Sequence, residues 1–216
     1  MVYKLELNMK ILKEEYAIGM AFLVRPWKRL TYKDVRDISG KKSKGYIYKA
    51  LSRLMFNNII STEQIGKSLL YVLNLDSLEA RSYIGFLKEY VSWNEKHIPK
   101  RVIEDVSAKI STKFFIFLVT GSYAKKTQTK KSDLDIIIIC DDSFDPKNIY
   151  AQISYAGETS IPLVHPYVFT KTQFLDMLLV DDENYGKEAA RHNFIFSGGS
   201  EYYSILNEAI KRGFKG

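Results

Sequence analysis

Cysteine is almost absent from this 216-residue sequence, which contains only Cys140. A single cysteine excludes an internal disulfide, and with it the disulfide-rich secreted scaffolds, and a reducing cytoplasm is the expected location. Because Cys140 lies in an apolar run, we interpret it as a core thiol and not as a nucleophile. Histidine is also scarce: His97, His165 and His192 are scattered, so no zinc site built from His and Cys is expected.

The sequence also lacks a run of about 18 apolar residues, the length that a membrane-spanning helix needs. Residues 1–7 carry an acidic side chain and no long apolar core, unlike a secretory signal. We therefore expect no membrane partner. The hydrophobic content of 46% and the aromatic content of 13% predict instead a fully folded chain of one large or two small domains.

The positive charge is unevenly distributed along the chain. Residues 1–75 contain 14 Lys and Arg against 6 Asp and Glu, a net charge of +8, whereas residues 76–216 contain 18 against 19, a net charge of −1. A basic module is thus joined to a nearly neutral one. Charge asymmetry of this kind favours nucleic acid as the partner of the first module.

The most informative segment, residues 121–135, reads GSYAKKTQTKKSDLD between two apolar runs at 114–119 and 136–140. Alternate residues of a strand point to the same face, so we expect Asp133 and Asp135 side by side and Leu134 in the core. Two adjacent carboxylates repel each other unless a cation lies between them, and Mg²⁺ prefers such oxygen ligands together with substrate phosphate. Gly121 allows a tight turn and a close approach to a ligand, and Ser122 is expected to begin a short helix whose N–H groups favour phosphate.

This segment resembles the Gly-Ser … Asp-x-Asp signature of the nucleotidyltransferase superfamily, the polymerase-β-like fold. Ten residues separate Ser122 from Asp133, the spacing typical of the minimal members. The resemblance implies that Asp133 and Asp135 are catalytic and bind Mg²⁺ or Mn²⁺. It also implies a nucleotide site for an NTP, with ATP the first choice, formed by Gly121, Ser122, Lys125, Lys126 and Ser132. Relatives often have glycine at the position of Lys126.

Active members of the family carry a third carboxylate on a later strand. The next strand expected here covers residues 161–169, and its inward polar residue is His165. Glu158, three residues earlier, is the nearest acid and becomes a catalytic candidate if that strand begins early. Imidazole suits zinc or manganese better than Mg²⁺. Three interpretations stay open: Glu158 completes the site, His165 does different work, or the site is weakened.

The basic module, residues 1–75, resembles a winged helix-turn-helix domain. Its pattern predicts helices at 9–24, 31–39 and 43–58, then a hairpin of strands 59–64 and 68–73, with a capping box from Thr31 to Asp34. In such domains the second helix of the pair enters the major groove of DNA. The expected nucleic-acid-binding residues are Lys44, Tyr48, Lys49 and Arg53 on that helix and Lys67 at the wing tip.

The remaining chain is divided into a helical connector, residues 76–98, and a nucleotidyltransferase domain, residues 99–216. Helices are expected at 99–110, 171–179, 185–196 and 201–212. The predicted fold class is α+β, a winged helix-turn-helix followed by a small mixed-sheet nucleotidyltransferase domain. The predicted function is metal-dependent transfer of a nucleoside monophosphate from NTP to an unidentified acceptor, with a protein acceptor among the alternatives. The other interpretation is a DNA-binding regulator whose second domain is degenerate or senses a nucleotide.

Overall fold

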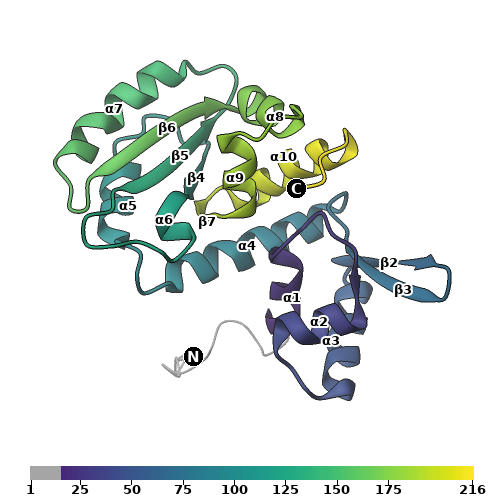
Figure 1. The fold of residues 1–216 in the computed structure, drawn as a ribbon. Coiled ribbons are helices and arrows are strands. Elements are labelled where there is room, and N and C mark those ends of the chain that lie inside the picture. Colours follow the sequence, from purple (N-terminus) through teal and green to yellow (C-terminus); the bar gives the residue numbers. More distant parts are fainter. Residues whose placement is uncertain (1–15) are drawn as a thin grey trace, which may run out of the picture.

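The computed structural model describes residues 16–216, and the first part of the helix predicted at 9–24 lies outside them. The N-terminal part consists of three helices and a small sheet (Figure 1). Its elements are α1 (Tyr16–Leu23), β1 (Leu30–Thr31), α2 (Tyr32–Ser39), α3 (Lys44–Phe56), β2 (Ile60–Ile65) and β3 (Ser68–Leu73). The three strands are antiparallel in the order β1-β3-β2.

Local signals set the ends of the helices in this part. The Thr31 side chain accepts a hydrogen bond from the Asp34 backbone, and the Asp34 carboxylate accepts one from the Thr31 backbone, which confirms the predicted capping box. Gly40 ends α2 with φ +66°, a left-handed conformation that glycine adopts without strain. Ser43 then caps α3.

The C-terminal part contains a mixed four-stranded sheet in the order β6-β5-β4-β7, in which only β5 and β6 are parallel. Its strands are β4 (Phe115–Val119), β5 (Leu134–Cys140), β6 (Val164–Thr170) and β7 (Phe194–Ser197). Its helices are α5 (Lys100–Ser107), α6 (Gly121–Ala124), α7 (Pro146–Glu158), α8 (Lys171–Leu179), α9 (Tyr185–Arg191) and α10 (Gly199–Lys211). The chain therefore has the expected mixed α+β composition.

Two predictions for this part need correction. The helix expected at 185–196 ends at Arg191, and Phe194–Ser197 forms strand β7 because it pairs with β4, a partner almost 80 residues away that local sequence cannot reveal. Helix α7 was not expected, although Asp145 caps it and Pro146 occupies its first turn, both common helix-start signals.

Side chains of β5 alternate between two separate cores. Leu134, Ile136 and Ile138 pack with residues of α5 and α7 on one face of the sheet. Ile137 and Ile139 pack with residues of α8, α9 and α10 on the other face. Figure 1 shows α5 and α7 on one side of the sheet and α8, α9 and α10 on the other. This alternation decides which polar side chains at the ends of the strands can meet.

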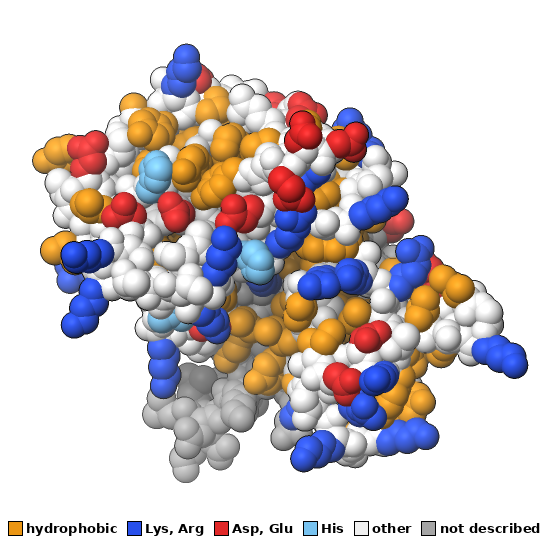
Figure 2. Space-filling model, in the orientation of Figure 1, with side chains coloured by type: hydrophobic (Ala, Val, Ile, Leu, Met, Phe, Trp, Pro, Cys, Tyr) orange, Lys and Arg blue, Asp and Glu red, His pale blue; other side chains and the backbone are white. Residues whose placement is uncertain are grey.

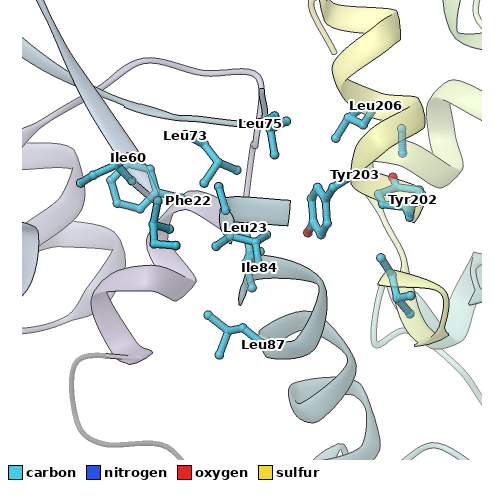
Figure 3. Close-up of a cluster of buried hydrophobic side chains, with 14 of the residues drawn as sticks. Phe22, Leu23, Ile60, Leu73, Leu75, Ile84, Leu87, Tyr202, Tyr203 and Leu206 are labelled. Carbon is cyan, nitrogen blue, oxygen red and sulfur yellow. The ribbon is translucent and has the colours of Figure 1, made fainter. Parts of the chain in front are cut away.

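The long helix α4 (Leu78–Asn94) joins the two parts through a common apolar core. Figure 3 shows Phe22 and Leu23 of α1 on one side of Ile84 and Leu87, and Tyr203 and Leu206 of α10 on the other. The packing is close where α4 meets α10, since a Cβ on Gly85 would lie 2.5 Å from the backbone nitrogen of Ser200. Within residues 16–216, no helix is long and apolar enough to cross a membrane.

Candidate active site

The turn after β4 brings a backbone glycine against a carboxylate. Gly121 begins the short helix α6 with φ +61°, and a Cβ at this position would lie 2.0 Å from Oδ2 of Asp135. The Thr120 backbone N–H donates to the Asp135 carbonyl at 2.9 Å, which fixes the turn beside the first residues of β5. Only glycine allows the carboxylate this close to the backbone.

Asp133 and Asp135 lie at the start of β5, as the sequence predicts, with Leu134 fully buried between them. Asp133 is exposed and immediately precedes the strand, whereas the Asp135 side chain is 28% exposed. Burial raises the pKa of Asp135, and the negative charges of Asp133 and Glu188 raise it further, while His165 opposes them. A carboxylate held under such repulsion is a favourable place for a cation.

The residue opposite Asp135 on the parallel strand β6 is His165. Its Nδ1 lies 3.6 Å from Oδ1 of Asp135, and its side chain is 59% exposed. Parallel pairing puts the two side chains on the same face of the sheet. His165 is thus the polar residue of β6 beside Asp135, as expected from the sequence, but its side chain is exposed and does not point inward.

Glu158, the predicted third carboxylate, does not join this group. Strand β6 begins at Val164, and Glu158 is the exposed last residue of α7. Helix α7 covers the face of the sheet that receives Leu134, whereas Asp135 points to the opposite face. The sheet therefore separates the two carboxylates.

Glu188 is the acidic residue that sequence reasoning missed. It lies on α9, which covers the face to which Asp135 points, and its charge contributes to the raised pKa of Asp135. Its Oε1 is 2.5 Å from Nζ of Lys125, just after α6. One turn earlier on α9, the Tyr185 hydroxyl is 2.6 Å from the Thr120 hydroxyl, which attaches the helix to the Gly-Ser turn.

The two lysines that follow α6 are both paired with glutamates. Lys125 pairs with Glu188, and Nζ of Lys126 is 2.9 Å from Oε1 of Glu95 at the end of α4. Lys126 has φ +58°, a left-handed conformation in which glycine is favoured, which gives a physical reason for glycine at this position in relatives. Lys125 is thus joined to α9, and Lys126 to the end of α4.

The two predicted serines have different surroundings. Ser122 lies in the first turn of α6, and its carbonyl accepts a hydrogen bond from the Thr127 backbone at 2.9 Å. The Ser132 hydroxyl accepts a hydrogen bond from the Thr129 backbone at 2.9 Å and so orders the loop before Asp133. Ser122 is therefore next to the glycine turn, while Ser132 shapes the approach to the acidic pair.

Residues 99–188 match the family model described as "Nucleotidyltransferase domain". This match supports the nucleotidyltransferase superfamily. It covers the Gly-Ser turn, both aspartates and Glu188, and at a coarse level it supports nucleotidyl transfer as the activity. No curated protein and no solved structure matched the chain.

The donor set of this candidate site fits a divalent metal only in part. Asp133 and Asp135 supply carboxylate oxygens, and Mg²⁺ is commonly held by one or two carboxylates together with substrate phosphates. In residues 16–216, no three His, Cys, Asp or Glu side chains form a group arranged to hold a metal ion.

The predicted nucleic-acid-binding residues of the N-terminal part are all exposed to solvent. Lys44, Tyr48, Lys49 and Arg53 are exposed along α3, and Lys67 is exposed in the turn between β2 and β3. Tyr48 stacks on Tyr32 with 4.9 Å between ring centroids, and Nζ of Lys44 lies 5.8 Å from the Tyr48 ring. The helix and the hairpin turn therefore present positive charge and one ordered aromatic ring to solvent.

Proposed function

We propose that this protein is a metal-dependent nucleotidyltransferase that moves a nucleoside monophosphate from an NTP, with ATP the first choice, to an acceptor. The observation that carries the proposal is the close contact between Gly121 and the Asp135 carboxylate. A Cβ added to Gly121 would lie 2.0 Å from Oδ2 of Asp135. This contact brings the glycine of the Gly-Ser turn against the second aspartate of the Asp-x-Asp pair. Asp133 and Asp135 would hold Mg²⁺ or Mn²⁺, which when bound neutralises phosphate charge and polarises the phosphoryl group.

The other residues of the turn would position the triphosphate. Gly121 and Ser122 offer backbone N–H groups at the start of α6, where the first N–H groups have no partner within the helix. Lys125 would exchange Glu188 for a phosphate oxygen, and Lys126 would add positive charge nearby. Ser132 would keep the loop in place through Thr129.

The transfer itself would be a displacement at the α-phosphorus. An oxygen of the acceptor forms a bond to this phosphorus, the bond from the phosphorus to the bridging oxygen of the β-phosphate breaks, and pyrophosphate leaves. If the acceptor is a hydroxyl, its proton must be removed. The His165 side chain, whose Nδ1 lies 3.6 Å from Oδ1 of Asp135, would accept it.

The N-terminal part is proposed to be a winged helix that binds nucleic acid, with DNA as the expected partner. Support comes from the order of its helices and strands, from the two-stranded hairpin β2–β3 and from the exposed basic residues of α3. In winged helices a helix of this position enters the major groove. Lysine and arginine would contact phosphates and so determine affinity more than sequence preference.

A melting experiment with ATP, GTP, CTP and UTP, each with and without Mg²⁺, tests the nucleotide site. A ligand that binds only the folded state raises the free energy of unfolding by about 2.7 kcal/mol at a hundredfold excess over Kd. We expect an Mg²⁺-dependent rise in Tm that is lost in Asp133→Asn/Asp135→Asn. We also expect Asp135→Asn to abolish pyrophosphate release. Asp105→Asn, an exposed change on α5, is the matched control and should keep both properties.

One observation favours a second function, a DNA-binding regulator that senses a nucleotide without transferring it. The third strand offers His165 and no carboxylate beside Asp135. Such a regulator would show the Mg²⁺-dependent rise in Tm but no pyrophosphate release with any acceptor. The proposed nucleotidyl transfer at the Asp pair is refuted if the wild-type protein and Asp135→Asn release pyrophosphate at the same rate.

A further inference from the structure

A basic cavity lies between the N-terminal part and the nucleotidyltransferase domain. It has a volume of about 540 Å³ and is lined by the end of α1 and the following turn, by α4, by the end of α9 and by the last residues of the chain. We call it the junction cavity. Its basic lining residues are Arg25, Lys28, Lys88, Arg191, His192 and Lys215. Figure 2 shows Lys and Arg side chains along the boundary between the N-terminal and C-terminal parts of the molecule.

Among residues 16–216, those that line the cavity include no Asp or Glu to balance these charges. Arg191 forms a two-pronged ion pair with Glu183, with N–O distances of 2.7 and 2.8 Å. Within residues 16–216, no carboxylate lies within 4.0 Å of the cationic nitrogens of the other lining residues. Apart from Arg191, the basic residues of the junction cavity therefore have no direct ion-pair partner within residues 16–216.

Lys88 is the most informative of the lining residues. It lies in the middle of α4, between the two parts of the molecule. An apolar side chain would be buried there at a lower cost in free energy than a lysine. Burial lowers the pKa of Lys88 to about 8, and the charge of Glu95 opposes this shift. Glu95 is already paired with Lys126 and His97. The Lys88 side chain is partly buried, and its Nζ lies 5.9 Å from the centroid of the Phe194 ring, a weak contact for a cation. A phosphate group bound beside Lys88 would offset the cost of burying its ammonium group.

We propose that the junction cavity binds phosphate groups, and that Lys88 at its wall and Arg25 and Lys28 from the N-terminal part are their ligands. A volume of this order accommodates a nucleotide-sized molecule. The phosphates could belong to a free nucleotide or polyphosphate, or to a nucleic-acid strand that passes between the two parts. Helix α9 carries Glu188 towards the Asp pair and Arg191 into the cavity, so the two sites are neighbours but do not share their ligands.

Because this site is separate from the Asp pair, it can be tested in Asp133→Asn/Asp135→Asn protein with EDTA present, where the catalytic site lacks its metal. The probes are inorganic tripolyphosphate and a short single-stranded oligothymidylate, titrated by calorimetry at low salt. The cavity variants are Lys88→Met and Arg25→Ala/Lys28→Ala, the second pair being exposed and so harmless to folding. The matched control is Lys109→Ala/Lys113→Ala, which removes two exposed lysines elsewhere.

We expect the control to bind like the parent and each cavity variant to bind about tenfold more weakly, a loss of about 1.4 kcal/mol. If the cavity variants lose affinity for tripolyphosphate, the phosphates that bind in the cavity belong to a free phosphate compound. If only the oligothymidylate binds to the parent, and the cavity variants lose this affinity, the phosphates belong to a nucleic-acid backbone. Binding of neither probe, or equal binding by parent and cavity variants, overturns the proposal. Neither result bears on the Mg²⁺-dependent nucleotide site, which the wild-type melting experiment tests.

Discussion

Gly121 and Asp135 are in such close contact that a single added methyl group on the glycine would lie 2.0 Å from the carboxylate. The two residues belong to different elements, α6 and the start of β5, and the contact positions the carboxylate directly above the turn that would receive phosphate. Glycine at this point therefore has two functions. It permits φ +61°, and it leaves space for the acid.

Gly121→Ala should consequently destroy the site even though it adds only one carbon. The new Cβ must displace Asp135, and alanine is strained at positive φ, so we expect the Mg²⁺-dependent rise in Tm with nucleotide to disappear. The free energy of unfolding should fall by about 1–3 kcal/mol. The matched control is Gly45→Ala in α3, where a Cβ meets nothing within 4 Å.

Gly45→Ala should leave nucleotide binding unchanged and stabilise the helix by about 0.5–1 kcal/mol. Nucleotide binding that survives in Gly121→Ala would show that the carboxylate does not need its observed position. Urea unfolding and the melting experiment with ATP measure both properties on the same samples.

The sequence predicts local features well because their causes are local. The capping box of Thr31 and Asp34 depends on residues three apart, and the alternation around Leu134 depends on neighbours in one strand. The site beyond the signature depends on the sheet and on helix placement. The pairing of His165 with Asp135 and the approach of Glu188 follow from the β5–β6 register and from which face α9 covers. Nearness in sequence favours Glu158, but it says nothing of the face of the sheet that α7 covers.

Glu188→Gln tests the ion pair at the candidate active site. Both partners are about two-fifths exposed, so the pair contributes little stability, and a phosphate must displace Glu188 to reach Lys125. We expect the affinity for ATP to rise about two- to fivefold, and the rise to persist with and without Mg²⁺. A titration with fluorescent ATP provides the measurement.

The matched control for this change is Glu158→Gln, which removes the same charge from the opposite face of the sheet. It should leave ATP affinity unchanged. A loss of Mg²⁺-dependent affinity in Glu188→Gln would contradict the expectation and identify Glu188 as a metal ligand. A loss in Glu158→Gln would contradict the separation of Glu158 from the Asp pair.

Lys88→Met should stabilise the protein while it weakens binding in the junction cavity. The pKa of Lys88 is lowered from 10.5 to about 8, so the folded state binds fewer protons than the unfolded state between about pH 8 and 10.5. The charged lysine therefore costs stability below pH 8, and this cost disappears as the pH rises through that range. At pH 7 we expect Tm to rise by about 2–4 °C, corresponding to about 1 kcal/mol.

The pH dependence separates this charge effect from a simple gain in packing. The difference in the free energy of unfolding between Lys88→Met and wild type should shrink as the pH is raised from 8 towards 10.5, because wild-type Lys88 loses its proton. Urea unfolding across this range measures the difference, in which the titration of other groups cancels. A difference that is constant with pH would mean that the lysine charge carries no cost.

Lys49→Ala tests the winged-helix interpretation of the N-terminal part. Lys49 is exposed on α3 and forms no ion pair within residues 16–216, so its removal should not disturb the fold. If α3 contacts the phosphates of duplex DNA, the slope of log K against log salt should decrease in magnitude by about one, and affinity should fall similarly for all sequences. Lys109→Ala, which removes an exposed lysine next to α5, should leave the slope unchanged. Equal slopes for wild type and Lys49→Ala would exclude this lysine from the contact, and absence of any duplex binding at low salt would exclude DNA as the partner of this part.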